Sequence, residues 1–134
     1  MRPDFSENHG SPLTAVFAGA LPSWSSVRNQ LARRGLAMKI RMIDGLPAFP
    51  DEEPADDWKE IRVAAADGMV TIRREANRVV FVTWGNASRG VLQAANALAW
   101  AFAEAGSGAI NGSDAAAFLR TADVPEGLKS DPAL

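Results

Sequence analysis

The clearest hydrophobic pattern of the chain lies in its middle, over residues 58–84. Three segments there, WKEIRVAA, MVTIRRE and RVVFVTW, alternate apolar and polar residues or are rich in β-branched residues. Short turns separate them, at Asp67-Gly68 and at Ala76-Asn77. Because successive side chains of a strand point to opposite faces and such dipeptides form tight hairpins, the pattern predicts a three-stranded antiparallel meander.

The third of these segments is apolar on both of its faces. Alternation places Val80, Val82 and Trp84 on one side. It places Val79 and Phe81 on the other side. A strand that is apolar on both sides belongs inside a sheet or beneath a second layer. We therefore expect this strand in the interior of the sheet.

A long helix is expected after the meander, from Ala87 to Ala105, with Gly106 as the residue that ends it. Its apolar stripe should pack on the sheet. That stripe consists of Val91, Ala95, Leu98 and Phe102, with Leu92 and Ala99 beside it. The opposite stripe is polar apart from one indole, and consists of Arg89, Gln93, Asn96, Trp100 and Glu104.

The amino-terminal part predicts a strand, a helix and a further strand. LTAVFAG is the first strand, the helix follows a cap at Ser23 or Ser25 and stops at Gly35, and AMKIRMI is the second strand. A short helix from Ser113 through Leu119 is expected near the carboxyl end.

The fold class that follows is α+β. We expect a mainly antiparallel sheet of four or five strands in the order β-α-β, linker, β-β-β-α, with the helices chiefly on one face. The domain is expected to span residues 13–120, between flexible tails at 1–12 and 121–134. The linker is the acidic, proline-rich loop 46–57, because three prolines and five acids in LPAFPDEEPADD oppose regular structure.

Composition removes several classes of function. The chain of 134 residues has no cysteine, which excludes disulfides, thiolate zinc sites and cysteine nucleophiles. Its single histidine, His9, lies in the expected amino-terminal tail, which excludes multi-histidine metal sites and histidine-dependent triads. The net charge of −2 argues against a dedicated nucleic-acid or membrane-surface protein.

Two further runs look like ligand sites but do not have the required spacing. The acids of 51–57 lack the alternating ligands and the glycine of a calcium loop, so a solvated loop is expected. The glycine-rich run 106–112 follows a helix and lacks Gly-Lys-Ser/Thr, so it is expected to be a flexible connection and not a phosphate loop. We expect no metal and no cofactor.

The expected compartment is the cytoplasm. The only stretch that resembles a signal-peptide core, Leu13 to Leu21, is short and follows Asp4 and Glu7 where basic residues should stand. No window approaches the roughly 18 apolar residues of a membrane span. A composition rich in alanine and arginine and poor in lysine suggests a bacterial source.

Trp100 carries the leading functional hypothesis. An exposed indole is rare and tends to mark a contact. Either the tail or the helix at 113–119 covers it within the same chain, or the polar stripe around it binds a protein partner, most simply a second copy in a symmetric dimer. The second alternative makes the protein a non-catalytic protein–protein interaction module, possibly homodimeric.

Two other classes remain open. A basic sheet face with Trp58 or Phe81 would bind single-stranded nucleic acid, unless Glu60 and Glu75 neutralise it. The residues of that face are Lys39, Arg41, Lys59, Arg62 and Arg73. A small-molecule binder or carboxylate-dependent enzyme would use Asp67, Glu60 or Glu75 with an arginine, although no nucleophile–base pair can be named. Trp84-Gly85-Asn86 would line a pocket or simply form a turn and helix cap.

Overall fold

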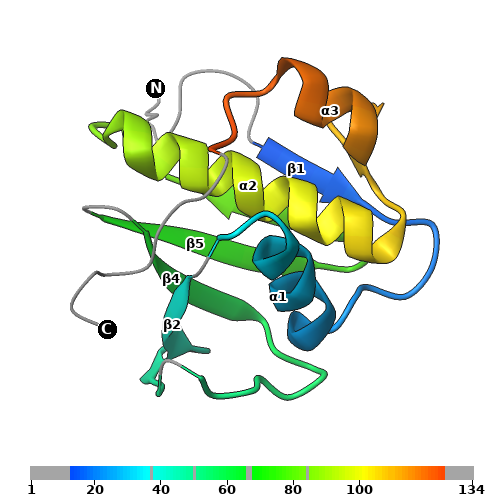
Figure 1. Cartoon of the computed structure of the whole chain (residues 1–134). Coiled ribbons are helices and arrows are strands. Elements are labelled where there is room, and N and C mark those ends of the chain that lie inside the picture. The colour runs from blue at the N-terminus through cyan, green and yellow to red at the C-terminus, as the bar shows by residue number, and fades with distance from the viewer. Residues whose placement is uncertain (1–12, 37, 50, 66–67, 84, 126–134) are drawn as a thin grey trace, which may run out of the picture.

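The computed structural model describes residues 13–36, 38–49, 51–65, 68–83 and 85–125 (Figure 1). Within them, one eight-stranded sheet has the order β3-β2-β4-β5-β6-β1-β7-β8, and all neighbours are antiparallel. The strands are β1 Leu13–Val16, β2 Lys39–Ile43, β3 Leu46–Pro47, β4 Glu60–Ala65, β5 Gly68–Glu75, β6 Arg78–Val82, β7 Ala109–Ile110 and β8 Ser113–Asp114. The helices are α1 Trp24–Arg33, α2 Arg89–Gly106 and α3 Ala115–Thr121.

The α+β class and the antiparallel meander are confirmed, but the sheet has eight strands and not four or five. The central pairings join Ile61 to Ile72 and Ile72 to Phe81, so apolar side chains of β4, β5 and β6 share one face. β6 lies between β5 and β1, in the interior of the sheet, as its apolar character on both faces predicts.

The additional strands are two-residue pieces closed by tight turns. β2 and β3 are joined by Asp44-Gly45, and β7 and β8 by Asn111-Gly112, all four residues with positive φ. Such two-residue turns match the twist of a hairpin. The expected loop at 46–57 therefore begins with a strand, and the expected flexible connection at 106–112 contains half of a hairpin.

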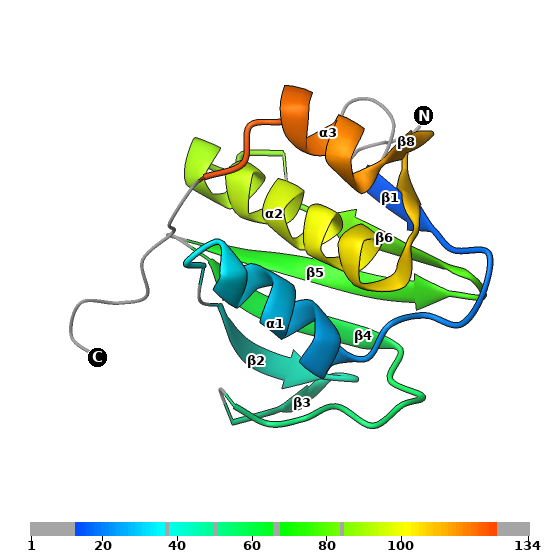
Figure 2. The ribbon, with the colours of Figure 1, turned by 45° about the vertical axis from the view of Figure 1, so that its right-hand side comes forward.

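The helices cover one face of the sheet. Figure 2 shows α1 and α2 side by side on that face, with α3 next to α2 near β8. The expected apolar stripe of α2 is buried, but burial extends to further residues because α1 and α3 flank the helix. Leu92, expected beside that stripe, is 47% exposed.

Several helix boundaries differ from the expectation. α2 begins after Ser88, whose Oγ accepts from the Val91 amide at 3.2 Å. It runs through Gly106, and Ser107 is the left-handed residue that follows. α3 is capped by Asp114, not Ser113. Of the two expected caps of α1, the structure uses Ser23.

Ordered contacts extend past residue 120, where the carboxyl-terminal tail is expected to begin. α3 continues to Thr121, and Asp123 hydrogen-bonds to α2. The expected tail at 1–12 and its His9 lie outside the described residues. No helix in the described ranges combines the length and the apolar character that crossing a membrane requires.

Candidate functional site

Trp100 is not an exposed indole. Its side chain is 7% exposed, and the guanidinium of Arg34 lies over its ring at 5.5 Å from the centroid. Arg34 follows the last residue of α1, so the neighbouring helix supplies the cover. Trp100 is therefore covered within the same chain, but the residue over its ring comes from the end of α1, whereas the sequence predicts the tail or the helix at 113–119 as the cover.

The polar stripe around Trp100 is also occupied by the chain itself. Asp123 accepts hydrogen bonds from Arg89 Nε at 3.0 Å and from Gln93 Nε2 at 2.9 Å. Asn96 Nδ2 donates to the main-chain oxygen of Asp123 at 3.2 Å. Glu104, the last member of the stripe, is exposed. Most of the surface first proposed for a partner therefore contacts residue 123.

This contact should depend on pH. The hydrogen bonds from Arg89 and Gln93 lower the pKa of Asp123 below its ordinary value of about 3.9. Because the pKa of Asp123 is lower in the folded state, the ionised carboxylate contributes to stability at every pH above its ordinary pKa. That contribution is lost as the pH falls through the lower, folded-state pKa. We expect the Arg89 Nε–H resonance to shift below about pH 4 in wild type and to remain unchanged in Asp123→Asn. The same low-pH shift in both proteins would contradict the assignment.

Three of the five basic residues predicted to share a sheet face lie on one face in the structure. Arg62 and Arg73 lie on the face without helices, where both contact Glu60, at 3.3 and 3.5 Å. Lys39 pairs with Ala64 on that face. Arg41 is at the bulge of β2. Lys59 precedes β4, and its Nζ donates to the main-chain oxygen of Asp57 at 3.5 Å. Nucleic-acid binding through this face stays a prediction.

The carboxylates proposed for an enzyme are held by arginines. Glu60 contacts two arginines, and Glu75 pairs with Arg78 at 2.9 Å. Asp67 and Trp84 lie outside the described residues. In the part of the chain that the structure describes, no three acidic, histidine or cysteine side chains gather as a metal site.

Among the described residues, the most exposed large apolar side chains were not predicted. Leu46 is 68% exposed and Phe49 is 75% exposed, at the β2–β3 edge of the sheet. We call these two residues the edge patch. Asp44 fastens this edge, because its Oδ1 accepts from the amides of Lys59 and Glu60 at 2.7 and 2.8 Å. The dipeptide Asp44-Gly45 between Ile43 and Leu46 is a strong hairpin pattern, and it would have located this edge from the sequence.

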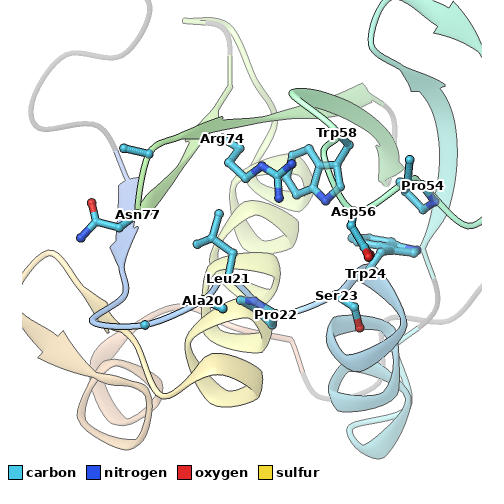
Figure 3. Close-up of a pocket in the computed structure, with 13 residues that line it drawn as sticks. Ala20, Leu21, Pro22, Ser23, Trp24, Pro54, Asp56, Trp58, Arg74 and Asn77 are labelled. Atoms are coloured by element: carbon cyan, nitrogen blue, oxygen red, sulfur yellow. The ribbon is translucent and has the colours of Figure 1, made fainter.

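A cavity of about 530 Å³ opens at the amino end of α1 (Figure 3). Its walls come from residues 19–24, from the turn before β4 and from the end of β5 with the turn that follows.

Comparisons with protein-family models, with curated proteins and with solved structures find no match to this chain.

An aromatic cluster supports the cavity from within the core. Trp58 and Trp24 are buried, and each ring centroid is 6.3 Å from that of Phe102. The guanidinium of Arg74 lies over the Trp58 ring at 4.9 Å, a cation–π contact. In Figure 3, Asp56 lies on the other side of Trp58, beside Trp24. An arginine and an aspartate thus line the same cavity.

Proposed function

We propose that this protein is a non-catalytic protein–protein interaction module and that its contact surface is the edge patch, Leu46 and Phe49. The observation that carries the proposal is the 75% exposure of Phe49, the highest among the large apolar side chains that the structure describes. Exposing an aromatic side chain costs apolar burial, and aromatic residues that fill a partner's pocket dominate binding energy.

The local backbone holds Phe49 in this position. Its amide donates to Glu52 Oε1 at 3.1 Å, and its carbonyl accepts from the Glu52 amide at 3.0 Å. Two hydrogen bonds to the same residue restrict the backbone of Phe49. A restricted backbone loses less conformational entropy when a partner binds.

The edge favours side-chain contact over strand addition. β3 has two residues and one of them is Pro47, which has no amide hydrogen to donate. A further strand would therefore find few hydrogen-bonding groups there. We expect the partner to receive Phe49 and Leu46 in an apolar pocket.

The charges beside the edge patch indicate the chemistry of the partner. Asp51 and Glu52 follow Phe49, and both are exposed. A second copy bound face to face would bring like charges together, which costs energy. A different protein with basic residues around its pocket fits better. We propose that the two proteins meet in the cytoplasm.

The test compares three proteins as bait in affinity capture at two salt concentrations: wild type, Phe49→Ser and Leu92→Ser. Leu92 is a matched control because it is an exposed apolar residue of α2, away from the edge patch. Loss of a central aromatic contact of about 2 kcal/mol or more should raise the Kd for the captured protein by about 30-fold. Leu92→Ser should bind as wild type does.

Two results would reject the proposal. One is a partner whose affinity is the same for wild type and Phe49→Ser. The other is a wild-type protein that retains no partner and sediments as a monomer at high concentration. A dimer that dissociates in Phe49→Ser would keep the edge patch as the interface and make the second copy its occupant.

A further inference from the structure

We propose that the cavity at the amino end of α1 binds a small zwitterion, a free amino acid with an apolar side chain. Arg74 would hold its carboxylate and Asp56 its ammonium group. This site lies apart from the edge patch and does not depend on the function proposed above.

Arg74 is placed to accept an anion. Its main-chain amide donates to the Lys59 carbonyl at 2.9 Å, which fixes the strand end that carries it. The guanidinium lies over the buried Trp58 ring at 4.9 Å. Within the described residues, no carboxylate is at ion-pairing distance from it. A guanidinium carries five N–H donors, so a contact with one indole leaves donors for a carboxylate.

The amino end of α1 is not the anion site. Ser23 Oγ accepts from the Ser26 amide at 3.2 Å, and Glu53 Oε2 accepts from the Ser25 amide at 3.1 Å. The chain therefore occupies these donors of the first turn with its own oxygens. Arg74 remains as the cationic group of the cavity wall.

Asp56 supplies the opposite charge. It lies in a turn that the Trp58 amide closes on the Ala55 carbonyl at 3.1 Å, and it lines the same cavity as Arg74. The two charges do not form an ion pair with each other. A phosphate or a dicarboxylate would meet repulsion from Asp56. A ligand with one carboxylate and one ammonium group can pair with both Arg74 and Asp56.

The remaining walls indicate the size and the character of the ligand. The volume of about 530 Å³ is in the usual range for small-molecule sites and exceeds that of a single amino acid. Leu21, Pro22 and Pro54 add apolar surface. Figure 3 shows Leu21 and Pro22 across the cavity from Arg74 and Trp58. An apolar side chain would lie against this wall.

The test is titration of the protein with the common L-amino acids at millimolar concentration, followed by the indole N–H resonances in a ¹⁵N spectrum. We expect at least one apolar amino acid to shift the Trp58 resonance and to leave unchanged that of Trp100, which lies beneath Arg34 and does not line the cavity. Its N-acetyl and amide derivatives should each bind at least tenfold more weakly.

Neighbouring residues provide matched variants. Arg74→Gln should weaken binding by about 10- to 100-fold, whereas Arg73→Gln, on the opposite face of β5, should not. Arg74→Lys keeps the charge without the planar edge and should lie between them. Asp56→Asn should abolish the difference between the amino acid and its N-acetyl derivative, and Asp57→Asn should preserve it.

Three outcomes would overturn the inference. The first is that no amino acid shifts the Trp58 resonance. The second is equal affinity in folded Arg74→Gln and in wild type. The third is that acetate or the N-acetyl derivatives bind as tightly as the free amino acid. Each of them leaves the edge patch proposal unaffected, because neither Leu46 nor Phe49 lines the cavity.

Discussion

Replacing Phe102 by alanine is expected to lower the free energy of unfolding by about 3–5 kcal/mol, the cost of emptying a closely packed aromatic position. Phe102 is fully buried in α2. Its ring lies 5.4 Å from that of Phe81 on β6 and 6.3 Å from those of Trp24 and Trp58, between centroids. One side chain therefore joins both long helices to the sheet and to the turn before β4.

The cost should be high because the surroundings cannot collapse into the space. Trp24, Trp58 and Phe81 are held by separate elements, and a cavity between them loses dispersion contacts on every wall. A domain of this size is usually stable by about 5–15 kcal/mol, so the variant should unfold at a much lower urea concentration. Circular dichroism during urea titration measures the change.

Leu92→Ala is the control for this experiment. It removes an apolar side chain from the same helix, but one that is 47% exposed. We expect a loss of no more than about 1 kcal/mol, since less area leaves the core. A similar loss in both variants would show that the packing around Phe102 is not the cause.

Replacing Gly108 by alanine should cost about 3 kcal/mol or prevent folding. A Cβ at this position would lie 2.6 Å from Cε2 of Phe17 and 2.9 Å from the carbonyl oxygen of Val16. Phe17 is fully buried and Val16 is paired in the sheet, so neither atom can move away cheaply. Overpacking therefore outweighs the gain of about 0.4–1 kcal/mol that a glycine-to-alanine change brings through the unfolded chain.

Gly19→Ala tests the same reasoning at a glycine where alanine should not lower the stability. No atom lies within 4 Å of a Cβ built at Gly19, so only the effect on the unfolded chain remains. We expect no loss of stability or a small gain. Phe17→Leu should recover part of the loss in Gly108→Ala, because it removes ring atoms but leaves the Val16 oxygen. Equal stability of Gly108→Ala and wild type would contradict the close approach.

The same close approach explains Gly106. Its sequence position after an amphipathic run suggested a left-handed helix end, but Ser107 has that conformation. A Cβ at Gly106 would lie 2.8 Å from Phe17 and 2.8 Å from Pro22. The glycine is required for space and not for its backbone freedom.

Tertiary context also overturned the interpretation of Trp100. A helical wheel with one apolar stripe assumes one covered face, and by that reasoning an indole among polar residues is exposed. α2 is flanked by α1 and by α3, and Arg34 covers the indole. The helical wheel therefore predicted correctly which residues face the sheet. It predicted the exposure of Trp100 wrongly, because it takes no account of a neighbouring helix.

The cavity could not be found from local pattern either. Arg74 and Trp58 are distant in the sequence, and the register that pairs Glu60 with Arg73 brings them together. From the sequence, alternation along β5 predicts only that Arg73 and Arg74 lie on opposite faces of the sheet. Pairing between strands decides which of the two meets an indole.

By itself, the sequence determined the elements that repeat over several turns or several strand residues. These are the meander of β4, β5 and β6, the helix α1 and the buried stripe of α2, because each is coded by neighbours in the chain. Tertiary structure decided the place of β1 between β6 and β7, the burial of Trp100, the exposure of Phe49 and the meeting of Arg74 with Trp58. Those features depend on contacts between residues far apart in the sequence, and no local periodicity records them.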